Sequence, residues 1–352
     1  MTRTNQISFC LSVWAVCFLL SVPAVQAVTI EEYITPSGAS SPADLAVAPD
    51  GAVWFTEINA NKIGRLIPAE TKPGTSNGIT EYALPEPNSQ PHYITVAKDG
   101  IVWFTEMAGN RIGRLDPASG AIQEYDIPTE DSEPHQIKEG PDGSLWFLEF
   151  NANKVGRLNP KDGTIQEYAV GEGHPHAMVV DGAHVWYTQG GMFWAKKFFN
   201  KVARLNTESG KVEEWTVPPQ KSVPHGMTQG GNGTVWFTQM FASKLAYLDF
   251  KQGTPPEIVE FHLGERKGPH DLIVDDRRQV VWFTANRPDS IGRLDLNKAQ
   301  PGTNEGVEFF PLADPKAHPS QLELDADGNV WFTEMGMYFR GKYNNKIGKL
   351  VP

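Results

Sequence analysis

Short runs of apolar, aromatic and β-branched residues recur along the chain, and turn residues separate them. Residues 91–96, 101–106, 110–115 and 122–125 are four consecutive runs, with Asp99-Gly100 in the first turn. Runs of this length and composition are typical of β-strands, and Asp-Gly pairs suit tight hairpins that need positive φ. No stretch shows sustained helical periodicity. The pattern therefore predicts an antiparallel all-β protein.

The same four-run unit repeats around a phrase in which a tryptophan follows Val or Leu and precedes Phe or Tyr. The seven tryptophans of this phrase are Trp54, Trp103, Trp146, Trp186, Trp236, Trp282 and Trp331. Consecutive members lie 40 to 50 residues apart, which is the size of a propeller blade. We therefore predict a seven-bladed β-propeller built of four-stranded antiparallel blades.

The two ends of the repeat complement each other. Residues 28–34 have the pattern of a fourth strand with no blade before it, and residues 345–350 that of a third strand with no fourth after it. The N-terminal strand is therefore expected to complete the last blade, which closes the ring and covers an exposed sheet edge. Residues 28–352 form a single propeller domain in this prediction.

The first 27 residues are excluded from the fold. Arg3 is their only charge, residues 7–22 are almost wholly apolar or small, and Val25-Gln26-Ala27 resembles a signal-peptidase site. This pattern predicts a cleaved secretory signal that is too short for a transmembrane span. Both cysteines, Cys10 and Cys17, lie within it, so the secreted or periplasmic product has no disulfide to stabilise it.

The net charge of the chain argues against some classes of binding partner. Lys and Arg number 31 and Asp and Glu 42, which gives a formal net charge of −11. That excess of acid argues against binding to nucleic acid or to an anionic membrane surface. We expect a monomer that acts on a small-molecule or oligosaccharide substrate and does not associate with a membrane after signal cleavage.

Candidate chemistry lies where the innermost strand of each blade begins. Five blades start this strand with Pro-His, which places histidines at His92, His135, His176, His225 and His270. The second strands end at the same face with Glu57, Glu106, Glu149, Gln189, Gln239, Ala285 and Glu334. The fold is thus expected to gather up to five imidazoles and four carboxylates, which could act as general bases, metal ligands or both. Alternatively, each histidine could bond a neighbouring blade's carbonyl and each glutamate a lysine, with purely structural roles.

Blade three has the fullest set of these groups. It alone carries an acid two residues before its histidine, in Glu133-Pro134-His135, and it also keeps Glu149. Two carboxylates and an imidazole can hold a divalent cation such as Mg²⁺ while the histidine transfers a proton. We therefore predict His135 as the catalytic residue, Glu133 and Glu149 as metal ligands, and His92 and His176 as substrate-binding residues. The alternatives are His176, His225 or His270 for catalysis and Glu106 or Glu334 for metal binding.

Two blades carry inserts between their second and third strands, at residues 190–199 and 336–343. Both inserts are rich in aromatic residues and contain Lys, and the second also contains Arg340. They are expected to project over the histidine face, where they could grip a ring-bearing or anionic substrate or pack on each other as a lid. The recurrent third-strand arginines are interpreted as scaffold. They are Arg65, Arg114, Arg157, Arg204 and Arg293.

The repeats that contain Trp103-Phe104-Thr105-Glu106 and Pro224-His225-Gly226-Met227 resemble the virginiamycin B (streptogramin) lyases over the whole mature chain. The resemblance implies a seven-bladed propeller that opens a cyclic depsipeptide by elimination across its ester bond. It also implies Mg²⁺ as cofactor, with a histidine base that removes an α-proton while the cation stabilises the enolate.

The family's site combines a Pro-His in one blade with Glu-Pro-His and a later Glu in the next blade. His92, Glu133, His135 and Glu149 reproduce this pattern and its spacing. An end-to-end alignment offers another set, which is His270, His318, Ser320 and Glu334. The resemblance thus leaves two possible locations for the site.

Three hypotheses about function follow. The first is a lyase that uses a divalent metal and a histidine base on an ester- or uronate-bearing substrate. The second is another propeller enzyme, either a metal-dependent lactonase or other hydrolase or a polysaccharide lyase. The third is a non-catalytic periplasmic propeller whose histidines capture a ligand or a metal.

Overall fold

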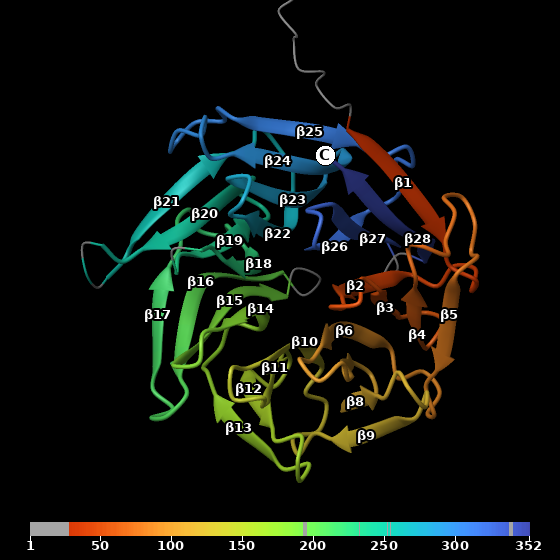
Figure 1. Cartoon of the computed structure of the whole chain (residues 1–352). Helices are drawn as coiled ribbons and strands as arrows, with labels where there is room; N and C mark the ends of the chain where they lie inside the picture. The colour runs from red at the N-terminus through yellow and green to blue at the C-terminus, as the bar shows by residue number, and fades with distance from the viewer. Residues whose placement is uncertain (1–27, 193–195, 232, 252, 254, 338–340) are drawn as a thin grey trace, which may run out of the picture.

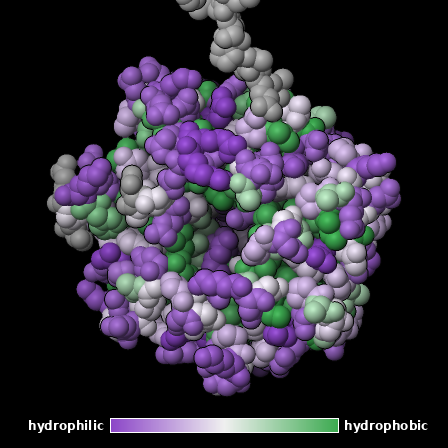
Figure 2. Space-filling model, in the orientation of Figure 1, coloured by the Kyte–Doolittle hydropathy of each residue, from purple (hydrophilic) through white to green (hydrophobic). Residues whose placement is uncertain are grey.

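The computed structural model describes residues 28–352 except 193–195, 232, 252, 254 and 338–340, so the predicted signal segment lies outside the described residues. Seven four-stranded antiparallel sheets stand as blades around a central axis (Figure 1). Figure 2 shows a largely hydrophilic surface that is hollowed at the centre of the ring. The described chain contains no helix that is long and apolar enough to cross a bilayer. The predicted seven-bladed all-β propeller is confirmed.

The strands follow the predicted order, with each blade running outward from its first strand. Blade one contains β2 (Pro42–Val47), β3 (Val53–Glu57), β4 (Lys62–Leu66) and β5 (Ile79–Ala83), and blade two contains β6 (Pro91–Val96), β7 (Val102–Glu106), β8 (Arg111–Leu115) and β9 (Ile122–Asp126). Blade three contains β10 (Pro134–Glu139), β11 (Leu145–Glu149), β12 (Lys154–Leu158) and β13 (Ile165–Ala169), and blade four contains β14 (Pro175–Val180), β15 (His184–Met192), β16 (Lys197–Asn206) and β17 (Val212–Thr216). Blade five contains β18 (Pro224–Gln229), β19 (Val235–Gln239), β20 (Lys244–Asp249) and β21 (Glu257–His262), and blade six contains β22 (Pro269–Asp275), β23 (Val280–Asn286), β24 (Asp289–Asp295) and β25 (Val307–Pro311). Blade seven contains β26 (Pro319–Leu324), β27 (Val330–Met337), β28 (Lys342–Val351) and, as its outer strand, β1 (Thr29–Ile34).

The N-terminal strand closes the ring as predicted. Strand β1 pairs antiparallel with β28 from Thr29 opposite Val351 to Ile34 opposite Lys346 (Figure 1). The ring of Tyr33 stacks on Trp331 with 5.5 Å between centroids. The closure therefore combines a full ladder of backbone hydrogen bonds with aromatic burial, and it joins residues more than 300 positions apart.

The hydrophobic core is divided into layers between neighbouring blades. Trp54 of blade one packs with Ile94 and Phe104 of blade two, and Trp103 of blade two packs with Phe147 of blade three. The third-strand arginines cover the outer side of these layers, as Arg65 does 5.3 Å from the centroid of Trp54. This placement agrees with the scaffold role expected for the arginine series.

Buried threonines link five of the seven pairs of neighbouring blades and hold the backbone that carries the inner-strand residues. Thr56 of β3 accepts a hydrogen bond from the Asp44 N–H at 3.1 Å and donates one to the His92 carbonyl at 2.9 Å. Later threonines donate to the corresponding carbonyl of the following blade, in the pairs Thr188 with His225, Thr238 with His270, Thr284 with Ser320 and Thr333 with Ala43. Blade three has Leu148 at this position.

We predict that Thr56→Val destabilises the protein by about 1–3 kcal/mol, because it leaves the buried Asp44 N–H and the His92 carbonyl each without a hydrogen bond. Urea unfolding of the wild type and the variant measures the difference. Thr164→Val is the control, because Thr164 is exposed and its loss is expected to change stability by less than about 0.5 kcal/mol. Equal effects at the two positions would contradict a bridging role for Thr56.

Candidate functional site

The Pro-His motifs bring five imidazoles together at one end of the channel, as predicted. Neighbouring ring centroids lie 5.0 Å apart for His92 and His135, 5.7 Å for His135 and His176, 4.6 Å for His176 and His225, and 4.0 Å for His225 and His270. Blades seven and one place Ser320 and Ala43 at the same position. The imidazoles therefore form an arc over five of the seven blades, with a gap lined by two small side chains.

Burial keeps these imidazoles neutral. The exposed fractions of His135, His176 and His225 are 6%, 2% and 4%. Burial lowers the pKa of His92 and of His176 to about 4 and that of His270 to about 3, and it lowers the pKa values of His135 and His225 well below 6.5. Neighbouring imidazoles lower these pKa values further, because positive charge on two adjacent rings is unfavourable. At neutral pH the arc is a set of uncharged bases and N–H donors.

Hydrogen bonding separates the five histidines into two groups. Nε2 of His176 bonds the Gly191 carbonyl at 2.9 Å. Nδ1 of His225 and Nδ1 of His270 bond the next blade's carbonyl, at 3.2 Å and 3.3 Å. Bonds of this kind to backbone carbonyls agree with the alternative hypothesis, in which these three histidines have a purely structural role. By contrast, the rings of His92 and His135 have no hydrogen-bond partner among the described residues, and their Nδ1 atoms are buried. These two imidazoles retain unused hydrogen-bonding capacity.

Two residues that were not identified from sequence hold His135 in place. The ring of Phe150 stacks on His135 with 4.5 Å between centroids and 16° between planes, and its edge meets His176 at 4.8 Å. Nδ1 of His174 bonds the Phe150 carbonyl at 3.0 Å. The available signals were an aromatic residue directly after Glu149 and a second histidine two residues before His176.

Two of the second-strand carboxylates contact groups other than the imidazoles, and the mixed cavity of imidazoles and carboxylates stays a prediction. Glu106 lies 3.0 Å from Arg111, and Glu334 accepts a hydrogen bond from Asn344 at 3.2 Å. The reason is the period of two along a strand. Because the residue before each glutamate, which is a threonine before Glu57, Glu106 and Glu334 and is Leu148 in blade three, lies on the opposite face of the strand, the glutamate side chain lies on the other side.

In blade five, Gln239 occupies the position that these glutamates occupy in other blades, and its contacts indicate their role. Its amide donates to Glu260 at 2.7 Å, beside Lys244. An amide has the shape of a protonated carboxyl, and burial next to a second carboxyl raises the pKa of Glu149 to about 8. Burial likewise raises the pKa values of Glu57 and Glu334 to about 8. These glutamates therefore act as neutral structural groups near pH 7.

The predicted metal ligands face different neighbours. Glu149 lies beside Glu167 and Lys154. Glu133 is half-buried, and burial raises its pKa while the nearby His174 opposes that shift. The described part of the chain contains no group of three or more His, Cys, Asp or Glu side chains placed to hold a metal ion. As the side chains lie, Glu133, His135 and Glu149 do not fit a shared cation, and the metal site remains a prediction.

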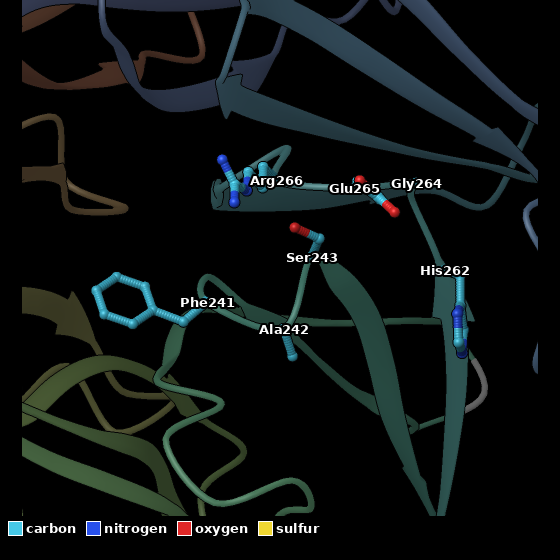
Figure 3. A pocket seen from close by; sticks show the side chains of 7 residues that line it. All are labelled: Phe241, Ala242, Ser243, His262, Gly264, Glu265 and Arg266. Carbon is cyan, nitrogen blue, oxygen red and sulfur yellow. The ribbon is translucent and has the colours of Figure 1, made fainter.

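A cavity of about 410 Å³ lies on blade five, on the face where the histidine strands begin (Figure 3). Its lining includes Phe241, His262 and Arg266. Phe241 is 48% exposed, and its ring lies 5.5 Å from that of Phe198 in the β15–β16 hairpin. The cavity wall thus contains aromatic and cationic side chains, and none of the five histidines of the arc lines it. The centres of the two predicted aromatic inserts, residues 193–195 and 338–340, lie outside the described residues.

Comparison with known proteins gives one consistent result. The sequence profile described as the virginiamycin B lyase family matches residues 25–193 and 189–350. The crystal structure of virginiamycin B lyase from Staphylococcus aureus is 30% identical with a TM-score of 0.77, covering 93% of this chain and 100% of that one. A streptogramin B lyase structure is 29% identical with a TM-score of 0.77, covering 92% of this chain and 97% of that one. A catalytically inactive histidine-to-alanine variant of the Staphylococcus enzyme, solved with quinupristin, is 30% identical with a TM-score of 0.76, covering 93% of this chain and 100% of that one. No curated protein sequence matches the chain.

We predict that Glu149→Gln reduces the loss of stability that the wild type shows as pH rises. The folded-state pKa of Glu149 is raised to about 8 from 4.5, so the folded protein keeps a proton that the unfolded chain releases. Stability therefore falls as pH rises between these two values and changes no further above them. Glutamine has no proton to lose, so this part of the fall disappears.

Urea unfolding at several pH values between 4.5 and 8 measures the effect. Glu305→Gln is the control, because Glu305 is exposed. An unchanged pH slope in Glu149→Gln, together with loss of turnover, would favour the metal-ligand hypothesis over the structural role.

Proposed function

This chain belongs to the virginiamycin B lyase family, and we propose that it is a carbon–oxygen lyase in which His135 is the base. The observation that carries the proposal is the state of His135. Its imidazole is buried, has a pKa well below 6.5, and has no hydrogen-bond partner among the described residues. A neutral imidazole with a free nitrogen lone pair can accept a proton without first losing one.

The reaction we propose is β-elimination across an ester. An imidazole nitrogen of His135 takes the proton from the carbon next to a carbonyl group. The electron pair left on that carbon forms a double bond to the neighbouring carbon, and the bond from that carbon to the ester oxygen breaks. The departing carboxylate keeps the bonding pair, so neither water nor a second proton donor is consumed. The ester-bearing substrate follows from the likeness to lyases of the streptogramin type.

His92 is the proposed substrate-binding partner. Its ring centroid lies 5.0 Å from that of His135, and its ring also has unused hydrogen-bonding capacity. A neutral imidazole can donate an N–H to a carbonyl oxygen and stabilise the negative charge that develops there. His176 would flank the substrate from the other side, with its orientation set by the Gly191 carbonyl.

The remaining expectations are part of the proposal. The resemblance implies Mg²⁺, but Glu133 and Glu149 face different partners, so no step is derived through a metal ion. Turnover before and after treatment with a chelator tests that requirement. The enzyme is proposed to be exported as a monomer, on the evidence of residues 1–27, and the N-terminus of the protein recovered outside the cytoplasm tests export.

We predict that His135→Ala lowers kcat by about 10²–10⁴ because the general base is lost, while the protein stays folded. The assay is the ultraviolet absorbance of the new double bond, with streptogramin B depsipeptides and uronates as trial substrates. His184→Ala is the control, because His184 lies on β15 where it contacts Trp186 rather than the arc. Full activity in His135→Ala with loss in His270→Ala would place the base in blade six instead.

We predict that kcat/KM stays constant as pH falls to 6.5 and decreases only below that value. The base must be neutral to act, and the pKa of His135 lies well below 6.5, so protonation inactivates it only in more acidic solution. The pH profile of kcat/KM measures this limb. An acid limb centred at or above 6.5 would exclude a buried imidazole of this kind as the base.

A further inference from the structure

The end of the channel opposite the histidines contains a second cavity, which the proposed reaction does not use. Its volume is about 260 Å³, and the later residues of the inner strands line it. A water molecule occupies about 30 Å³, so the space holds several waters or one molecule of amino-acid size. The charged and amide side chains in its wall are Asp44, Gln136, Lys138, Glu139, Gln229, Asp271, Gln321 and Glu323.

Three of these acids already have structural partners, and one of them is Glu139, which accepts a hydrogen bond from the Lys98 N–H at 2.9 Å. The other two are Asp44 and Asp271. Asp44 accepts hydrogen bonds from the Leu45 and Ile94 N–H groups at 2.8 Å and 2.9 Å. Asp271 accepts one from the Leu322 N–H at 3.3 Å. Burial raises the pKa of Asp44 to about 7 and that of Asp271 to about 8. Asp44 and Asp271 link one inner strand to the next by hydrogen bonds, and they are therefore poor candidates for binding a ligand ion.

Lys138 and Glu323 differ, because both side chains line the cavity and neither has a hydrogen-bond or ion-pair partner among the described residues. They stand at the same level of strands β10 and β26, in blades three and seven. Burial raises the pKa of Glu323 and the Lys138 ammonium opposes the shift, so the two groups interact through space. No ion pair or side-chain hydrogen bond involves either group within the described chain. An opposite pair is thus held apart across a cavity.

The amide side chains supply polar groups between these charges. Gln321 is 5% exposed and lines the cavity, yet its side-chain amide has no hydrogen-bond partner among the described residues. Gln136 accepts a hydrogen bond from the Met178 N–H through its oxygen, while its amide nitrogen has none. Buried amides without partners cost stability unless water or a ligand satisfies them.

From this arrangement we propose that the cavity is a binding site for a small zwitterionic amino acid, whose carboxylate binds Lys138 and whose ammonium binds Glu323. A simple anion or cation would pair one of the two side chains and leave the other unpaired in a confined space, which is unfavourable. A zwitterion pairs both, and its backbone can meet the Gln321 amide. The site is separate from the imidazole arc, so its occupation does not depend on the proposed lyase reaction.

Calorimetric titration of the full chain with amino acids of increasing charge separation tests the proposal. Glycine, β-alanine and γ-aminobutyrate are the probes, and acetate and methylamine are the single-charge controls. We expect one zwitterion to bind at least about tenfold more tightly than either control, a difference of about 1.4 kcal/mol. Acetate or methylamine binding as tightly, or no zwitterion binding at all, would overturn the proposal.

Variants locate the binding in the cavity. Lys138→Met and Glu323→Gln should each weaken the best zwitterion at least about tenfold, and the charge-exchanged double variant, Lys138→Glu with Glu323→Lys, should recover binding with the ligand reversed. Lys161→Met is the control, because Lys161 is exposed. Unchanged affinity in both single variants would contradict the assignment. Circular dichroism checks the fold of each variant, and if any fails to fold the wild-type titration decides alone.

Discussion

Each blade of this propeller has two apolar faces, and neither can be left in water. Trp103 and Phe104 are consecutive residues of β7, yet Phe104 packs towards blade one and Trp103 towards blade three. A blade is therefore stable only between two neighbours, and the last must meet the first. The pairing of β1 with β28 satisfies this requirement without a disulfide in the described chain. Radial packing then forces seven inner strands to converge on one axis.

Convergence of the inner strands explains the chemistry of the arc. Histidines that would be unremarkable on an isolated strand come within 4.0 to 5.7 Å of one another. At that spacing, with little water, charging one ring raises the cost of charging the next. Three of the rings form internal hydrogen bonds, and two have none to the described residues. The distinction between scaffold histidines and those that we propose to react therefore rests on hydrogen bonding rather than on position in the repeat.

Much of the fold could be predicted from the sequence because the repeat is long and regular. The tryptophan spacing gave the number of blades, and the unmatched first and last strands gave the closure. The mouth of the channel was predicted less well. The five histidines converge as expected, whereas Glu57, Glu106 and Glu334 each follow a threonine, and Glu149 follows Leu148. The alternation in Thr56-Glu57 indicates where the glutamate points only once the bond of Thr56 to the His92 carbonyl is known.

Contacts between side chains of different blades could not be predicted from the sequence. Phe150 stacks on His135 through the folding of one blade, whereas Lys138 and Glu323 line the same cavity only because the ring closes. A register shift interrupts the alternation of every inner strand, as between Pro134 and Ile137 in β10, so a simple period of two cannot tell which side chains reach the channel.

The inner strands give the channel two chemically different ends. His135 and Lys138 lie three residues apart on β10, which corresponds to about 10 Å along a strand. At the first end, aromatic packing and neutral imidazoles favour proton transfer in a site with little water. At the second, Lys138, Glu323 and an amide side chain that have no partner among the described residues favour a polar ligand. Because the two ends share strands but not side chains, a substitution at one can leave the chemistry of the other intact, and the two proposed functions can be separated by experiment.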